Sequence, residues 1–191
     1  MTEGSAELYF DLGSPYAYLA LERAEAVFGG PVTLVPVLVG AIFGWRGQGS
    51  WARTPERAAG MAEIERRARE YGLPPMAWPP EWPANALSAM RCATWAARER
   101  RVAQFAHVVG RRQWTEAADI ADLEVLTTCA REAGIDEGAM LEAIQTPELK
   151  EQLRATTERA FEDGVRGVPT VRVGERVFFG DDRLEQAAAA V

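Results

Sequence analysis

The first forty residues limit most strongly what this chain can fold into, because they predict a strand, a helix and a second strand in succession. Residues 7–11 (ELYFD) alternate polar and aromatic side chains, which is typical of a strand. Ser14 and Pro15 then suit the N-cap and the first turn of a helix that ends at Gly29. Residues 32–39 (VTLVPVLV) indicate a strand buried on both faces of a parallel sheet. The chain therefore begins with a β-α-β unit.

The middle of the chain has helical spacing, and its end returns to strands. Two short strands over residues 170–173 and 176–179 flank a two-residue turn, and a last helix begins at Asp181. Helices are predicted over residues 54–71, 86–109, 120–133, 136–145 and 147–163. This order predicts an α/β thioredoxin-like fold, in which an inserted α-helical domain (residues 41–159) interrupts a thioredoxin-like domain (residues 1–40 and 160–191).

Composition excludes several classes of function. The net charge of −7 disfavours nucleic acid and anionic membranes as partners. The sequence has neither a secretory signal pattern nor a long uncharged apolar run, so we expect a cytoplasmic protein without a membrane span. The two cysteines, Cys92 and Cys129, lie far apart and form no C-x-x-C, and the single histidine, His107, has no companions at ligand spacing. We therefore expect neither a disulfide framework nor a metal site.

Three segments carry residues suited to chemistry. Ser14 would lie beside the unpaired N–H groups of a helix end, where an anion such as a thiolate is stabilised, although capping alone also explains it. Only about 5–6% of X-Pro bonds in folded proteins are cis, so the residues alone favour a trans Val168–Pro169 bond. A cis bond would leave the Val168 backbone free to pair with an extended peptide. Asp181 and Asp182 either cap the last helix or hold the ammonium group of a γ-glutamyl ligand.

Together with further motifs, these segments resemble one protein family. Six motifs follow one another along the chain: S-P-Y-x-Y-L from Ser14, G-A-I-F from Gly40, Y-G-L-P from Tyr71, W-P-x-N from Trp82, G-V-P-T from Gly167 and G-x-D-R-L from Gly180. This pattern is similar to the 2-hydroxychromene-2-carboxylate isomerases and the related kappa-class glutathione transferases, over nearly the full chain. The resemblance implies a DsbA-type thioredoxin fold, glutathione as a cofactor that is regenerated, and a homodimer.

The resemblance also implies roles for individual residues around glutathione. Ser14 would hydrogen-bond and activate the sulfur, with Pro15 and Tyr16 shaping the pocket floor. Val168 would pair with the peptide backbone beside a cis Pro169. Asp181 and Asp182 would bind the γ-glutamyl end. Members of the family often have Asn shortly after G-A-I-F, where this chain has Gln48, and Gln48 would contact the group that the Asn contacts.

An aromatic carboxylic acid is the implied substrate, and its contacts are less sharply defined. Trp45, Trp78 and Trp82 would form an aromatic wall near Asn85, although a large aromatic side chain also fits a core role. Arg46 or Arg53 would meet the substrate carboxylate, although a solvated surface role fits each arginine too.

Rival functions on the same fold differ in what they need at the first helix. Dithiol oxidoreduction of the DsbA type needs two cysteines there, and this chain has Ser14 and Ala17 instead, so we exclude it. A kappa-class-like glutathione transferase or peroxidase uses the same serine contact and stays open. A non-catalytic glutathione or peptide binder also stays open.

Overall fold

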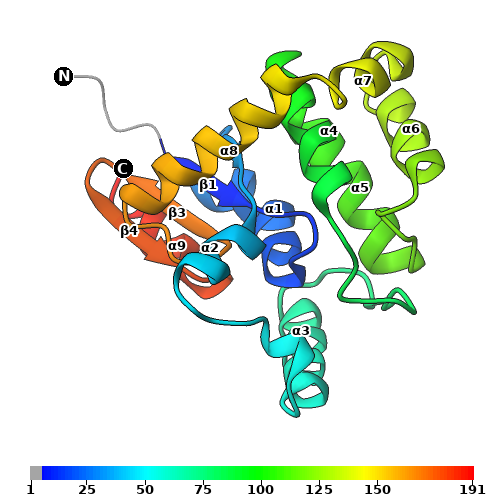
Figure 1. The fold of residues 1–191 in the computed structure, drawn as a ribbon. Coiled ribbons are helices and arrows are strands. Elements are labelled where there is room, and N and C mark those ends of the chain that lie inside the picture. The colour runs from blue at the N-terminus through cyan, green and yellow to red at the C-terminus, as the bar shows by residue number, and fades with distance from the viewer. Residues whose placement is uncertain (1–5) are drawn as a thin grey trace.

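A computed structural model describes residues 6–191, and it forms a mixed four-stranded sheet covered by helices (Figure 1). The strand order is β2-β1-β3-β4, with β1 parallel to β2 and antiparallel to β3, and β3 antiparallel to β4. The strands are β1 (Glu7–Phe10), β2 (Thr33–Pro36), β3 (Thr170–Val173) and β4 (Arg176–Phe179). The α-helices are α1 (Pro15–Phe28), α2 (Val39–Trp45), α3 (Arg57–Glu70), α4 (Leu87–Arg98), α5 (Val102–Glu116), α6 (Leu123–Glu132), α7 (Glu137–Ala143), α8 (Pro147–Glu162) and α9 (Leu184–Ala188). Two 3₁₀ turns, η1 (Trp51–Arg53) and η2 (Asp181–Arg183), precede α3 and α9.

Alternating side chains of β1 separate the two faces of the sheet. Leu8 and Phe10 are fully buried in the main hydrophobic cluster, which includes residues of α1 and α9. Tyr9 points to the opposite face and packs in a smaller cluster with Ile42 of α2 and Ala160 of α8. The sheet is therefore a layer between α1 and α9 on one side and α2 and α8 on the other, as Figure 1 shows.

The main hydrophobic cluster continues from the sheet into α4–α7, which form a bundle at one side of the molecule (Figure 1). The predicted division into a thioredoxin-like domain and an inserted helical domain stays a prediction, and this shared core crosses its boundary.

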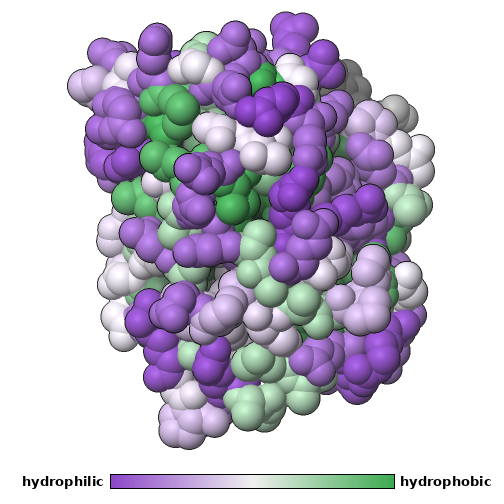
Figure 2. Space-filling view, turned by 90° about the vertical axis from the view of Figure 1, so that its right-hand side faces the viewer, coloured by the Kyte–Doolittle hydropathy of each residue, from purple (hydrophilic) through white to green (hydrophobic). Residues whose placement is uncertain are grey.

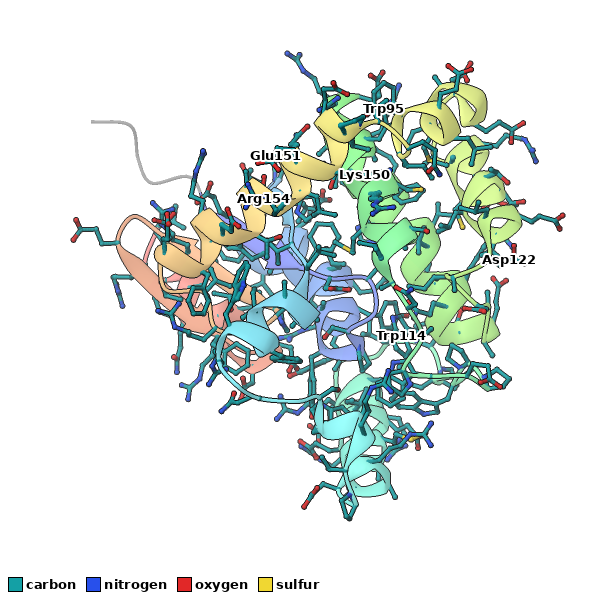
Figure 3. The ribbon with its side chains drawn as sticks, in the orientation of Figure 1. Trp95, Trp114, Asp122, Lys150, Glu151 and Arg154 are labelled. Atoms are coloured by element: carbon teal, nitrogen blue, oxygen red, sulfur yellow. The ribbon has the colours of Figure 1, made fainter. Side chains whose placement is uncertain are left out.

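The view in Figure 2 shows that hydrophilic side chains interrupt the hydrophobic areas on one face of the molecule. In Figure 3, Lys150, Glu151 and Arg154 point outward from α8, with Arg154 and Glu151 paired at 2.6 Å.

The second strand differs from its prediction. It ends at Pro36 and lies at the sheet edge with Thr33 exposed, so the expectation of a strand to residue 39 buried on both faces is wrong. The Val39 N–H donates to the Asp11 carboxylate at 2.9 Å, which satisfies an amide at the start of α2. A side chain directly after β1 therefore favours a helix where the apolar pattern alone favoured a strand.

The predicted helix over residues 86–109 is two helices, α4 and α5. Arg100 has a φ of 57°, in the left-handed region, and the Arg101 N–H donates to the Ala96 carbonyl at 2.8 Å in a helix-ending turn. Glycine usually occupies such a position, and its absence removed the signal for a break. The remaining predicted elements are confirmed within a few residues, including the two-residue turn between β3 and β4. No helix in residues 6–191 is long and apolar enough to cross a membrane.

Candidate active site

The turn between β1 and α1 presents Ser14 at the amino end of the helix. Ser14 is the N-cap of α1, its Oγ accepts the Ala17 N–H at 3.3 Å, and Pro15 occupies the first turn. The Ser14 N–H itself donates to the Asp11 carbonyl at 3.0 Å, which fixes the turn. Because the hydroxyl accepts that helix N–H, its own hydrogen is free to donate to a ligand beside the positive end of the helix.

Ser14 lines a cavity of about 190 Å³, which we call the Ser14 cavity. Its walls come from α1, α2, η1, the loop before α4, and the segment leading into β3. Trp51 and Trp82 give it an aromatic side, with their ring centroids 5.5 Å apart. The lining residues are Gly13, Ser14, Pro15, Tyr16, Val39, Phe43, Ser50, Trp51, Trp82, Pro83, Val168 and Phe179.

Val168 borders this cavity directly before β3, and the Val168–Pro169 bond is cis. The trans expectation drawn from the residues alone is therefore wrong, and the cis bond implied by the family resemblance is confirmed. The Val168 N–H and C=O make no hydrogen bond within residues 6–191. The Pro169 carbonyl accepts the Gly180 N–H at 2.9 Å, which brings the segment after β4 beside it. The backbone N–H and C=O groups of Val168 are therefore unpaired at a residue that lines the Ser14 cavity.

A second cavity, of about 210 Å³, lies on the other side of Tyr16 and Val168 and contains Asp181 and Asp182. We call it the Asp182 cavity. Its lining residues are Tyr16, Arg67, Val168, Pro169, Phe179, Gly180, Asp181 and Asp182.

The two neighbouring carboxylates of this cavity have different surroundings. Asp181 is buried, and its oxygens accept from Arg67 Nη1 at 2.8 Å and the Tyr71 hydroxyl at 2.9 Å. Burial raises the pKa of Asp181, although the Tyr71 bond and the Arg67 charge oppose the rise. Asp182 is 53% exposed, and its nearest cation is Arg67 at 3.8 Å. Asp182 is therefore the carboxylate that remains available to a ligand.

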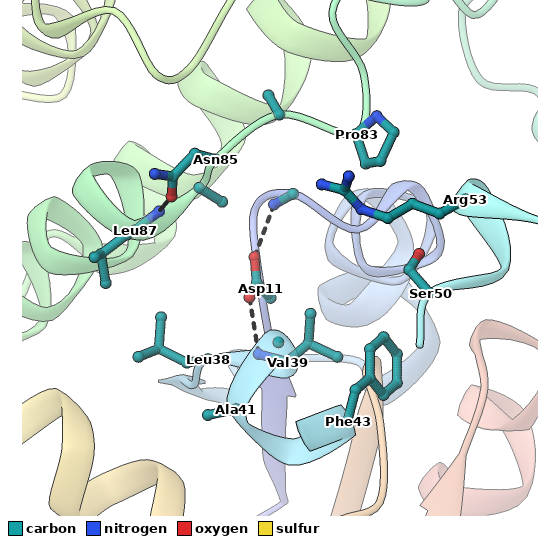
Figure 4. Close-up of a pocket in the computed structure, with 14 residues that line it drawn as sticks. Asp11, Leu38, Val39, Ala41, Phe43, Ser50, Arg53, Pro83, Asn85 and Leu87 are labelled. Carbon is teal, nitrogen blue, oxygen red and sulfur yellow. Dashed lines mark hydrogen bonds between the residues drawn. The ribbon is translucent and has the colours of Figure 1, made fainter. Parts of the chain in front are cut away.

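A third cavity, of about 550 Å³, adjoins the Ser14 cavity and contains Asp11, Arg53 and Asn85 (Figure 4). We call it the Arg53 cavity. Leu38, Val39, Phe43 and Leu87 provide apolar walls, and the Arg53 side chain extends over the space from η1. Arg53 makes no ion pair within the described part of the chain. A single cation above apolar walls suits a ligand with one anionic group on a hydrophobic body.

Asp11 lies at the inner side of this cavity and is 4% exposed. Its Oδ1 accepts the Gly13 N–H and its Oδ2 accepts the Val39 N–H, both at 2.9 Å. Burial raises its pKa from 3.8 to about 6, against the lowering effect of the two backbone hydrogen bonds. This one side chain therefore joins the turn before Ser14 to the start of α2.

The structure brings together most of the residues predicted for the cofactor and only some of those predicted for the substrate. Ser14, Pro15, Tyr16, Val168, Pro169, Asp181 and Asp182 line the Ser14 and Asp182 cavities. Trp82, Asn85 and Arg53 line the Ser14 or the Arg53 cavity. Gln48, Trp45, Arg46 and Trp78 line none of these three cavities.

The residues outside the cavities have other contacts. The Trp45 ring packs edge-on against Phe161 with centroids 5.3 Å apart, and Arg46 donates to the Arg166 carbonyl at 2.6 Å. Trp78 packs beside Trp82 and donates from Nε1 to Glu65 at 2.8 Å. Placing these three side chains on the substrate therefore lacks support from the geometry.

Sequence reasoning missed Asp11, Ser50, Trp51, Arg67 and Phe179 as cavity residues. Asp11 carried a signal, because an acidic residue directly after a strand and before a helix N-cap stands where strands deliver functional groups. Arg67 lies on α3, far from Asp181 in sequence, and no local pattern indicates that the two meet.

Cys92, Cys129 and His107 lie outside these cavities. Both cysteines are free and buried, and burial raises their pKa to about 12 for Cys92 and about 11 for Cys129. His107 Nδ1 lies 2.9 Å from the Glu22 carboxylate, a contact between α5 and α1. The described residues contain no cluster of side chains suited to hold a metal ion.

The sheet order, the cis proline before β3 and the N-capping serine at α1 define a thioredoxin-like protein without cysteine at its first helix. The family model of the DSBA-like thioredoxin domain matches residues 6–191, and the chain belongs to that family.

Individual relatives agree with this assignment. The chain is 29% identical to 2-hydroxychromene-2-carboxylate isomerase of Sphingobium xenophagum over 188 residues, covering 94% of this chain and 93% of the relative. It is 28% identical to glutathione S-transferase kappa 1 of Homo sapiens over 201 residues, covering 96% of this chain and 89% of the relative. A solved 2-hydroxychromene-2-carboxylate isomerase structure superposes with a TM-score of 0.86 at 23% identity, covering 97% of this chain and 93% of that one. The predicted DsbA-type thioredoxin fold and the resemblance to these two groups of enzymes are confirmed.

Proposed function

We propose that this protein is a glutathione-dependent isomerase acting on 2-hydroxychromene-2-carboxylate or a similar aromatic carboxylic acid. The observation that carries the proposal is the Ser14 hydroxyl, which lines a cavity at the amino end of α1 with its hydrogen free to donate. The isomerase and transferase relatives support the same class of chemistry.

The residues present fit glutathione along the Ser14 and Asp182 cavities. The unpaired N–H and C=O of Val168 suit an extended peptide backbone, with Pro15, Tyr16 and Pro169 as neighbouring walls. The exposed carboxylate of Asp182 suits an α-ammonium group. Asp181 supports this arrangement indirectly, because its oxygens already accept from Arg67 and Tyr71.

The substrate is assigned to the Arg53 cavity in this proposal. Arg53 would pair with the carboxylate, and Phe43 and Leu87 would contact the aromatic body. Asn85 lines the same cavity, and Trp82 lines the adjoining Ser14 cavity. Since Gly13, Val39, Phe43, Ser50 and Pro83 line both this cavity and the Ser14 cavity, a substrate here would lie next to the sulfur.

When bound, glutathione would supply a thiol nucleophile that is recovered at the end of the reaction. Ser14 would donate a hydrogen bond from Oγ and, with the unpaired N–H groups of α1, favour the ionised form of that thiol. Arg53 would hold the substrate carboxylate and stabilise negative charge that develops next to it. Trp51 and Trp82 would limit the access of water from the aromatic side.

A kappa-class-like glutathione transferase or peroxidase is the second candidate, because the same serine contact serves conjugation and the human relative is a glutathione S-transferase. A non-catalytic glutathione or peptide binder is the third. Binding of glutathione without turnover of any chromene or electrophile would select the third. A homodimer stays a prediction from the family resemblance, and a cytoplasmic location stays a prediction from the sequence pattern.

The decisive test replaces Ser14 by Ala and measures glutathione-dependent turnover of 2-hydroxychromene-2-carboxylate. Removing the donor should lower kcat by about 100-fold or more. Loss of the helix cap should cost about 1 kcal/mol of stability, so the variant stays folded. Thr146→Ala is the matched control, because Thr146 caps α8 with the same 3.3 Å geometry to the Leu149 N–H and lies outside all three cavities. An unchanged rate in Ser14→Ala would end the catalytic assignment.

A further inference from the structure

Phe179 is the most exposed of the large hydrophobic side chains that line the Ser14 and Asp182 cavities. It is 59% exposed at the end of the edge strand β4, where it pairs with Thr170. Single exposed hydrophobic residues are common, so exposure alone carries no conclusion. The neighbouring Phe178 points the other way and packs against the main hydrophobic cluster. Phe179 and Val177 therefore share the opposite face of β4.

The position of Phe179 is specific with respect to the cavities. Among residues 6–191, only Tyr16, Val168 and Phe179 line both the Ser14 cavity and the Asp182 cavity. Tyr16 and Val168 are more deeply placed, so Phe179 is the solvent-facing member of the passage between the two cavities. A ligand that occupies both cavities would therefore lie beside this ring, together with Tyr16 and Val168.

The backbone beside Phe179 leaves room for its ring. A Cβ atom at Gly167 would lie 2.7 Å from Cε2 and 3.1 Å from Cζ of Phe179, so the ring rests on the glycine. The Gly180 N–H, directly after Phe179, donates to the Pro169 carbonyl at 2.9 Å and holds the end of β4 in place. The ring is thus seated against the segment that carries the unpaired Val168 backbone.

We infer that Phe179 is a specificity-determining residue that selects thiols with a γ-glutamyl arm. The inference rests on the proposed function, in which the sulfur occupies the Ser14 cavity and the γ-glutamyl end occupies the Asp182 cavity. The arm then crosses the passage, and the exposed face of the Phe179 ring covers its aliphatic part. A thiol without this arm occupies the Ser14 cavity only and leaves the part of the ring that lines the Asp182 cavity in water.

The test compares equilibrium binding of three thiols by tryptophan fluorescence, because Trp51 and Trp82 line the Ser14 cavity. Glutathione and γ-glutamylcysteine carry the arm, and cysteinylglycine lacks it. In Phe179→Ala the Kd of the two γ-glutamyl thiols should rise about ten-fold, and the Kd of cysteinylglycine should change less than two-fold. Phe179→Leu should restore most of the affinity. Val177→Ala is the matched control on the same face of β4, outside the cavities, and should change none of the three.

The outcomes separate this inference from the proposed function. If the unaltered protein binds glutathione and Phe179→Ala binds it equally well, the role of Phe179 is refuted and the proposed function stands. Equal weakening of all three thiols also refutes it, because the ring would then shape the fold rather than select the arm. If the unaltered protein binds no glutathione, the proposed function is refuted together with this inference.

Discussion

The Ser14 cavity and the Arg53 cavity adjoin each other but are held by different kinds of interaction. Ser14 and Val168 lie on segments fixed by backbone hydrogen bonds, from Ser14 N–H to Asp11 and from Gly180 N–H to Pro169. The Arg53 cavity is walled mainly by side chains of α2, η1 and the loop before α4, outside the sheet. Backbone-fixed geometry tolerates little change, whereas side-chain walls can vary. We therefore expect the first cavity to set the chemistry and the second to set the choice of substrate.

The Asp11 carboxylate bonds to both regions, at the Gly13 N–H and the Val39 N–H. Its titration tests whether the carboxyl group is buried between them. Folding raises its pKa from 3.8 to about 6, because burial outweighs two backbone hydrogen bonds. Between these pH values the folded state holds the proton more tightly than the unfolded state. The stability contributed by Asp11 is therefore fully present below about pH 3.8 and is lost as the pH rises through about 6.

Asp11→Asn removes this dependence. Relative to the unaltered protein, the unfolding free energy of the variant should rise by at most roughly 3 kcal/mol between about pH 4 and about pH 7.5, as measured by urea unfolding at each pH. The comparison with the unaltered protein cancels the contributions of other carboxylates. A difference that does not change with pH would show that Asp11 titrates normally and that its carboxyl group is not buried between the two cavities.

Arg53 tests the substrate side of the comparison. Arg53→Ala should raise the KM for the aromatic acid about ten-fold, because a charge-assisted contact is lost, and should leave the Kd for glutathione within two-fold. Arg46→Ala is the matched control, since Arg46 lies outside the cavities and bonds to the Arg166 carbonyl. If both variants or neither raised the KM, the assignment of the substrate carboxylate to the Arg53 cavity would be wrong.

Gln48 gives the smallest expected effect. It was predicted to contact the cofactor, but it lines neither the Ser14 nor the Asp182 cavity. Gln48→Ala should change the Kd for glutathione less than two-fold, as measured by the fluorescence titration. A loss of five-fold or more would mean that the loop holding Gln48 closes on the ligand and that the Ser14 cavity extends beyond its present walls.

The parts of the site that the sequence could predict are those with a local signal. Ser14 and Pro15 are typical of the start of a helix, and Asp181 and Asp182 lie at the start of the last helical segment. Arg67 and Phe179 could not be predicted, because their roles depend on contacts with residues far away in sequence. The residues predicted for the substrate are the ones that the cavities support least, since tryptophans and arginines fit cavity, core and surface equally well until packing decides between them.

For the fold as well, elements with a local sequence signal could be predicted, and elements that depend on distant contacts could not. The β-α-β start and the final strand pair have strong periodicity and punctuation, and the structure confirms them. The break at Arg100 has no glycine or proline to mark it. The Val39 N–H at the start of α2 donates to the carboxylate of Asp11, a residue directly after β1 that lies outside the segment 32–39.

The burial of Cys92 and Cys129 has a consequence for how such a protein would withstand reactive compounds. With their pKa values raised to about 12 and about 11, both thiols stay protonated and shielded at neutral pH. If glutathione binds as proposed, an alkylating agent that enters the Ser14 cavity would meet a thiol only on glutathione, because neither cysteine lines that cavity. The alkylated glutathione would then dissociate and be replaced by unmodified glutathione. The two buried cysteines would stay unmodified.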